Sequence, residues 1–214
     1  QIKTYAENGL TTDFAPEVGD AYEWYDFSWR YLRAGGWART DMRVINAMDH
    51  NYPSRWPSDN IWPDGDPGEA DPTNDARITS DFEYLSSNNF RPDRGYYHFS
   101  SYRHARYDFL AEQAWYGIGI KPIFMSWECD LLVAEALYRA NDEAGAKAIL
   151  NDAAKPRKVR GGCPDVTASG ADLLRYILDE KDIECYLTGA GVPYFDMRRT
   201  DRLQPQTLLH FPVP

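Results

Sequence analysis

Two tryptophans lie among polar side chains in one proline-rich stretch of the sequence. Trp56 and Trp62 belong to residues 49–77, where prolines and glycines recur too often for a regular helix or strand. Indole rings on a polar loop are hard to explain as core, whereas a sugar offers an apolar CH face to a ring and hydroxyls to nearby polar groups. We therefore expect Trp56 and Trp62, supported by Asn60 and Arg55, to contact a saccharide. The alternative is that both rings fold back and hold the loop in place.

A second group of aromatic residues lies upstream, in a segment that we expect to be helical. Residues 21–34 follow a suitable N-cap, Asp20, and contain neither Gly nor Pro. The aromatic residues of this segment are Tyr22, Trp24, Tyr25, Phe27, Trp29 and Tyr31. Because a helix buries an apolar stripe of about 100°, some of these rings must face something other than the core. We expect Trp24, or Trp37 beyond this segment, to be a secondary saccharide platform, and contact with a neighbouring domain or protein is the equal alternative.

Carboxylate pairs alone do not indicate a glycoside hydrolase, because the chain has 33 Asp and Glu residues. A hydrolase needs two carboxylates at a defined separation across a cleft. Glu128 and Glu135 share one expected helical face, but that face belongs to a helical hairpin. The histidines show no HxH or HExxH spacing, and neither a GxSxG motif nor a Gly-rich phosphate loop is present. We expect no catalytic residues.

Metal and cofactor binding find little support in the sequence. The acidic residues of the proline-rich stretch are Asp64, Asp66, Glu69, Asp71 and Asp75. Their spacing does not follow the EF-hand pattern, so a solvated acidic loop is favoured over a calcium site. Cys129, Cys163 and Cys185 form no CxxC pair, which excludes a disulfide scaffold and disfavours zinc. We expect no metal and no cofactor, and we expect Cys129 and Cys185 to be buried and free.

The composition indicates a globular chain with an acidic surface. The 214 residues are 43% apolar and 26% charged, and they carry a formal charge of −10. This charge repels phosphate backbones, so nucleic acid is a poor candidate partner. No apolar run approaches the roughly 20 residues that a membrane-spanning helix needs. The sequence begins without Met or an export signal and ends in an extended segment, so we expect a piece of a longer protein.

Regular helices are expected mainly in the second half of the chain. The periodic apolar pattern predicts three of them. The first is capped by Ser126 and runs to about Ala140, the second lies near 143–154 before Pro156, and the third begins after Thr167 or Ser169 and stops at Gly189 and Gly191. Residues 78–110 alternate aromatic and polar side chains and predict short strands or irregular coil. Ala134, Ala146 and Ala153 have the small-residue spacing of a tetratricopeptide hairpin, and a hairpin with alanines by chance is the alternative.

The stretch SWECDLLVAEALYR at 126–139 resembles the "AEA" helix of the SusD/RagB family, the surface nutrient-binding lipoproteins of Bacteroidetes-type bacteria. The segment ILDEKDIE at 177–184, followed by FDMRR at 195–199, resembles its "ER..EL..EG.R..D.RR" segment, with Lys181 where the family usually has Arg. The terminal FPVP at 211–214 is similar to the "PIP" that follows.

The resemblance implies a mainly α fold, with a tetratricopeptide-like helical hairpin plus an irregular, loop-rich half. Residues 1–119 would be the variable ligand-binding region, and residues 120–214 the SusD-like helical region. The family's role implies non-catalytic binding of an oligosaccharide or polysaccharide and its delivery to a SusC-like TonB-dependent transporter. It also implies a surface-exposed outer-membrane lipoprotein, held in the membrane only through an upstream lipid anchor. A helical-repeat adaptor for protein segments is the second candidate, and a glycoside hydrolase is the third.

Overall fold

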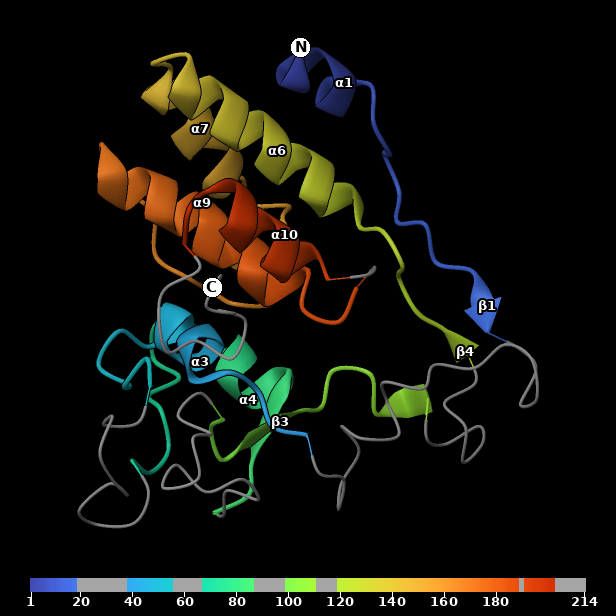
Figure 1. Cartoon of the computed structure of the whole chain (residues 1–214), viewed down its shortest axis with the longest axis vertical. Coiled ribbons are helices and arrows are strands. Elements are labelled where there is room, and N and C mark those ends of the chain that lie inside the picture. Colours follow the sequence, from blue (N-terminus) through green and yellow to red (C-terminus); the bar gives the residue numbers. More distant parts are fainter. Residues whose placement is uncertain (19–37, 56–66, 87–98, 111–118, 189–190, 203–214) are drawn as a thin grey trace, which may run out of the picture. The chain divides into compact units, whose positions relative to one another are not determined.

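The computed structural model describes residues 1–18, 38–55, 67–86, 99–110, 119–188 and 191–202. The chain divides into two compact units (Figure 1). The helical unit consists of Gln1–Pro16 and Lys121–Asp196, and the mixed unit consists of Glu17–Ile120 and Met197–Pro214. The expected helix at 21–34 lies outside the described residues.

The helical unit is built on a hairpin of two antiparallel helices, α6 (Ser126–Arg139) and α7 (Glu143–Leu150). A short turn joins them, in which Asn141 has a positive φ of 64°. The Asp142 side chain caps α7 by accepting a hydrogen bond from the backbone N–H of Gly145 at 2.9 Å. The structure therefore confirms the expected hairpin and the mainly helical fold.

The start of α6 differs from the sequence prediction. Met125 occupies the N-cap position, and Ser126 is the first helical residue. The Asp13 carboxylate accepts hydrogen bonds from both the backbone N–H and the hydroxyl of Ser126, at 2.8 and 2.9 Å. The capping acceptor thus comes from a residue more than a hundred positions upstream, which a local capping rule cannot find.

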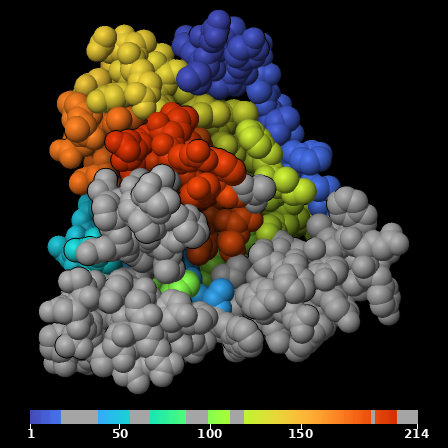
Figure 2. Space-filling view, in the orientation of Figure 1, coloured from blue at the N-terminus to red at the C-terminus, as the bar shows by residue number. Residues whose placement is uncertain are grey.

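Helix α1 (Ile2–Glu7) packs against α6, so the first residues of the chain belong to the helical unit. Figure 2 shows this blue segment beside the yellow-green surface of α6. A Cβ atom on Gly9, just after α1, would lie 2.5 Å from Sγ of Cys129. Only glycine allows this close approach, because no side chain could fit there without displacing the helix.

The ends of the later helices also differ from prediction. Helix α7 ends at Leu150 and not near residue 154, so Ala153 is exposed and outside the hairpin. Asn151 follows it, and its side-chain amide exchanges hydrogen bonds with the backbone of Val166 at 2.8 and 3.1 Å. Pro156 begins a short helix, α8 (Pro156–Val159), as expected of proline in a first helical turn.

Helix α9 (Ala171–Glu184) completes the core of the helical unit. It is preceded by Gly170 and ends at Glu184, with Cys185 as its C-cap, before the predicted Gly189. The core combines one side of α6 and α7 with one side of α9, and its fully buried members include Leu131, Ala134, Ala146, Leu150 and Leu173. The last helix, α10 (Val192–Arg199), begins in the helical unit and ends in the mixed unit.

The described elements of the mixed unit are short. Two short helices, α3 (Met42–Met48) and α4 (Arg77–Ser80), accompany an antiparallel ribbon of β2 (Phe82–Tyr84) and β3 (Tyr102–His104). A second pair joins β1 (Glu17–Val18) to β4 (Gly119–Ile120). The described parts of 49–76 hold no helix or strand, as predicted. The described residues of 78–110 include the predicted short strands, but residues 78–80 belong to α4, where strand or coil was expected.

No helix in the part of the chain that the structure describes is long and apolar enough to cross a membrane.

Candidate functional site

A pocket of about 420 Å³ lies in the mixed unit, beside the β2–β3 ribbon. Residues of the loop before α4, of α4 itself and of both strands line it. The lining side chains that bear on binding are Glu69, Thr79, Glu83, Tyr84, Tyr102 and Arg103. The site therefore combines aromatic rings, carboxylates and one guanidinium, brought together from three separate stretches of sequence.

Tyr102 fixes the aromatic part of this pocket. Its hydroxyl accepts a hydrogen bond from the backbone N–H of Ala70 at 2.7 Å, which ties the ribbon to the loop before α4. Its ring lies 5.4 Å from that of Tyr84, its register partner across the ribbon, and 6.0 Å from that of Tyr52. Tyr102 is buried and Tyr84 is half-buried, so Tyr84 is the more accessible of the two rings.

The guanidinium of Arg103 is buried and bound by two carboxylates. It donates from Nε to Glu83, and from Nη1 and Nη2 to the two oxygens of Asp108 at 2.8 and 2.5 Å. Hydrogen bonds to Asp108 raise the pKa of Arg103, and those to Glu83 raise it further. Burial lowers the pKa of nearby Arg39, and the charge of Arg103 lowers it further. The positive charge of Arg103 is thus neutralised from within the protein.

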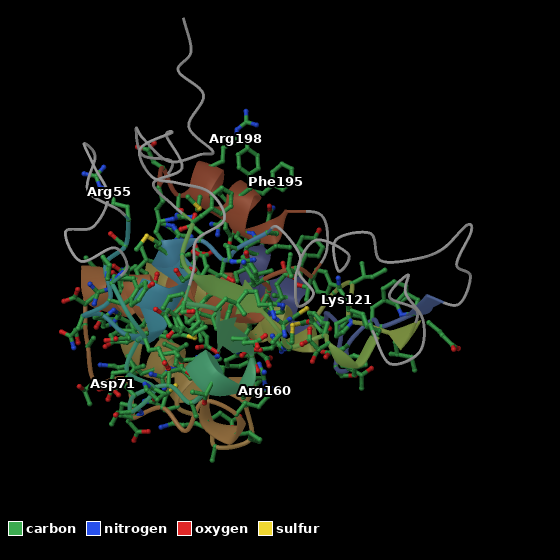
Figure 3. All side chains as sticks on the ribbon, turned by 90° about the horizontal axis from the view of Figure 1, so that it is seen from below. Arg55, Asp71, Lys121, Arg160, Phe195 and Arg198 are labelled. Atoms are coloured by element: carbon green, nitrogen blue, oxygen red, sulfur yellow. The ribbon has the colours of Figure 1, made fainter. Side chains whose placement is uncertain are left out.

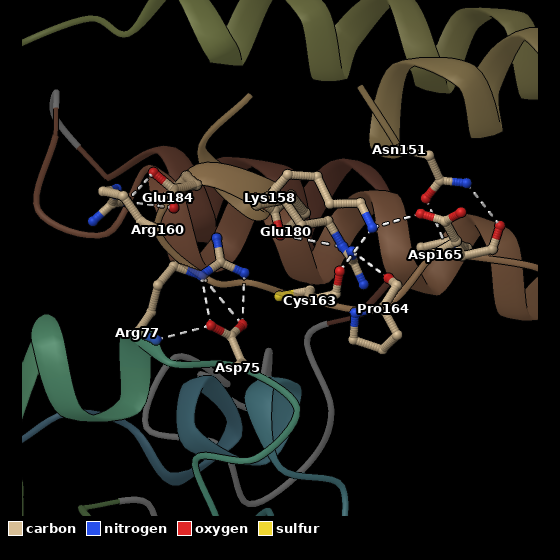
Figure 4. Close-up of polar contacts among 12 residues, drawn as sticks. Asp75, Arg77, Asn151, Lys158, Arg160, Cys163, Pro164, Asp165, Glu180 and Glu184 are labelled. Carbon is tan, nitrogen blue, oxygen red and sulfur yellow. Dashed lines mark hydrogen bonds and ion pairs between the residues drawn. The ribbon is translucent and has the colours of Figure 1, made fainter. Parts of the chain in front are cut away.

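The acidic loop beside the pocket holds its own shape through its carboxylates. Asp49 accepts hydrogen bonds from the backbone N–H groups of Asn51 and Asp71, at 3.0 and 2.9 Å. Asp71 in turn accepts from the side chain and backbone of Thr73, and these hydrogen bonds lower the pKa of Asp71. The pairing of Asp75 with Arg77 at 2.6 Å is almost completely buried (Figure 4). These carboxylates therefore stabilise the conformation of the loop.

The residues that the sequence predicts for binding lie mostly outside the described ranges. These are Trp24, Trp37, Trp56, Asn60 and Trp62. Arg55 is described, and it is exposed at the end of residues 38–55. Figure 3 shows its side chain pointing away from the packed side chains around it.

The pocket itself was missed by sequence reasoning. Its lining residues form no motif, because the ribbon and the loop assemble them from separate segments. The one available signal was the alternation of aromatic and polar residues within 78–110, which includes Phe82, Tyr84 and Tyr102.

The helical unit contains a buried group of charged residues. Lys181 on α9 forms an ion pair with Asp196 on α10, with Nζ and Oδ2 2.7 Å apart, and both side chains are buried. Glu128 on α6 is also buried, and among the described residues its Oε2 atom has no hydrogen-bond partner. Burial raises the pKa of Glu128; the Lys181 charge opposes this effect and the Asp196 charge adds to it. The group joins three helices, in the positions of the motif that resembles the SusD/RagB family.

Further polar contacts join α9 to α6, to α8 and to Arg160, which follows α8 (Figure 4). Arg160 donates from Nη2 to both carboxylate oxygens of Glu184, at 2.5 and 2.6 Å. The indole N–H of Trp127 donates to Glu180 at 3.2 Å, and Nε of Arg157 lies 3.9 Å from the same carboxylate. These side chains are occupied with one another, which favours a structural role.

The cysteines behave as small core residues. Cys129, Cys163 and Cys185 are buried and free, as predicted for the first and third. Burial, with the nearby Glu128 charge, raises the pKa of Cys185, so its thiol stays protonated at neutral pH.

No protein-family model and no curated protein matches this chain. A comparison of structures finds the crystal structure of a SusD-like protein from Bacteroides fragilis NCTC 9343. The TM-score is 0.57 at 18% sequence identity, and the match covers 94% of this chain and 47% of that one. The chain has a SusD-like fold. It spans about half the length of the solved structure that it matches.

Proposed function

We propose that this chain is part of a non-catalytic protein that binds an oligosaccharide or polysaccharide at the cell surface. The observation that carries this proposal is the SusD-like fold, which extends over 94% of the chain. Its supporting features are the motifs that resemble the SusD/RagB family and an abundance of aromatic residues, including seven Trp and 15 Tyr. Such rings combine an apolar face with polar groups, as carbohydrate recognition requires.

The same proposal extends to the protein's partners and location. The bound saccharide would pass to a SusC-like TonB-dependent transporter in the outer membrane. The whole protein would be surface-exposed and held by a lipid on an upstream cysteine. A search for a lipid-modified N-terminal Cys in the complete gene product tests this, and a product exported without lipid contradicts it.

Two other functions receive less support. The α6–α7 hairpin by itself is compatible with a protein-binding adaptor, but it forms one compact unit with α1 and α9. Glu128 and Glu135, the carboxylate pair on α6, are only 7% and 4% exposed. Carboxylates buried in a packed helical unit cannot reach a glycosidic bond, so they give no support to a glycoside hydrolase.

For the binding residues we propose Trp56 and Trp62, supported by Asn60 and Arg55, with Trp24 or Trp37 as a secondary platform. Stacking on one indole is worth on the order of 1 kcal/mol, about fivefold in affinity, and the apolar area that the ring buries adds to this. Trp56→Ala or Trp62→Ala should therefore weaken saccharide binding about tenfold while leaving the melting temperature nearly unchanged. Saccharide titration beside thermal melting measures both effects.

The exposed Tyr5, at 77% exposure on α1, provides a matched control. Tyr5→Ala removes an exposed ring from the helical unit and should leave affinity unchanged. Equal affinity in wild type and both Trp variants would place the binding site elsewhere, and a collapse of the melting temperature would show that the indoles hold the fold.

A further inference from the structure

The size of the pocket beside the β2–β3 ribbon suits a small polar ligand. Its volume of about 420 Å³ falls within the roughly 300–1,000 Å³ typical of small-molecule sites. The loop before α4 is anchored to the ribbon through Ala70 and Tyr102, and to the end of α3 through Asp49 and Asp71. The walls are therefore fixed before a ligand arrives, which reduces the entropy lost on binding.

Tyr84 offers this pocket a pre-oriented ring. It is half-buried, and its ring packs at 57° against that of Tyr102, which is fixed by its own hydrogen bond to Ala70. A tyrosine held in this way loses little freedom when a ligand packs against it. The partly exposed Tyr84 side chain can contact the apolar CH face of a sugar.

Glu69 supplies a hydrogen-bond acceptor to the same pocket. It is exposed, and its carboxylate forms no hydrogen bond or ion pair to another described residue. An ionised carboxylate accepts hydrogen bonds at both oxygens and donates none. Neighbouring hydroxyls of one sugar ring are donors at a matching spacing.

The charges around the pocket disfavour an anionic ligand. Its one described cation, Arg103, is already bound by Glu83 and by both oxygens of Asp108. An anionic sugar would have to displace one of these carboxylates and would also approach Glu69. The formal charge of −10 on the whole chain also repels an anionic ligand.

We propose that this pocket is a subsite for an uncharged saccharide residue, with Tyr84 as the stacking ring and Glu69 as the acceptor for hydroxyls. The assignment rests on the proposed saccharide-binding function and specifies its ligand class. It predicts a preference for neutral oligosaccharides over those that carry uronic acid or sulfate groups.

The test is calorimetric titration of the 214-residue chain with two sets of probes. Cello-, malto-, xylo- and manno-hexaose are the neutral set, and oligogalacturonate and a sulfated oligosaccharide are the anionic set. For the neutral probe that binds best, Tyr84→Ala should weaken affinity about tenfold, and Glu69→Gln about threefold. Tyr5→Ala and Glu7→Gln, at exposed positions on α1, are matched controls that should change nothing.

Glu69→Gln keeps the assignment testable if Tyr84→Ala fails to fold, because Glu69 is exposed. A neutral probe bound by wild type with unchanged affinity in both pocket variants overturns the subsite and leaves the proposed function standing. Binding of the anionic set alone, or tighter binding by Glu69→Gln, overturns the ligand class. Failure to bind any saccharide overturns both the subsite and the proposed function.

Discussion

The carboxyl group of Glu128 is buried, which is unfavourable for its charged form. It lies on α6 with 7% exposure, close to the Lys181–Asp196 ion pair. Burial raises its pKa above the ordinary glutamate value of 4.5, because the ionised form loses its hydration. The cluster therefore contains a carboxyl group that is protonated more easily than an ordinary glutamate.

This shift gives the stability of the chain a specific pH dependence. A folded-state pKa above the unfolded value means that the contribution of Glu128 is complete below pH 4.5 and is lost as pH rises through the folded pKa. Glu128→Gln removes this loss. The free energy of unfolding of the variant, relative to wild type, should therefore increase between pH 4 and pH 8.

Chemical denaturation at a series of pH values measures the difference. Glu7→Gln is the control for replacing an exposed carboxyl group, because Glu7 lies on α1 with a side chain that is 48% exposed. If the difference in the free energy of unfolding between Glu128→Gln and wild type stays constant or shrinks as pH rises, burial does not raise the pKa of Glu128.

Single residues were predicted with mixed success. Burial of Cys129 and Cys185 followed from their apolar helical surroundings and is confirmed. The capping role of Ser126 was wrong, because the acceptor at that helix start is Asp13. Local sequence rules use only residues that are close in sequence, whereas Asp13 is close to Ser126 only in the folded structure.

At the scale of elements, the α6–α7 hairpin was the most predictable part of the fold. Ala134 and Ala146 are fully buried where the two helices meet, as the small-residue spacing indicated. Ala153 does not take part, since α7 ends at Leu150 and Asn151 turns to bind Val166. The close approach of two helices is encoded locally, whereas the exact helix end depends on a distant segment.

The hairpin makes a direct prediction about side-chain size. Ala146 on α7 is fully buried, whereas Ala148 on the same helix is exposed. Ala146→Leu should destabilise the fold by about 1–3 kcal/mol through overpacking, and Ala148→Leu should change stability by less than about 0.5 kcal/mol. Equal effects of the two substitutions in denaturant unfolding would contradict the packing.

The β2–β3 ribbon shows why the pocket escaped prediction. Its strands have three residues each and are separated by a long connection. Short strands carry little periodic signal, and their pairing is set by the register Phe82 to His104 and Tyr84 to Tyr102. The neighbourhood of Glu69 and Tyr84 exists only after that pairing has formed.

At the scale of the whole molecule, the helical unit consists of two segments that lie on either side of a long insertion in the sequence. Gln1–Pro16 and Lys121–Asp196 form one unit although more than a hundred residues separate them in sequence. The helices of the second segment were predictable from periodicity, but the joining of α1 to α6 was not. Composition and motifs indicated the fold class, and tertiary contacts determined the rest.

Saccharide binding without turnover is the central claim for the whole chain. The most direct measurement is one set of titrations with neutral and anionic oligosaccharides, followed by assay of the same samples for new reducing ends. We predict saturable binding of at least one neutral probe, weaker binding or none for the anionic probes, and no reducing ends beyond the untreated control. Release of reducing sugar at enzymatic turnover, or the absence of binding to every probe, would contradict it.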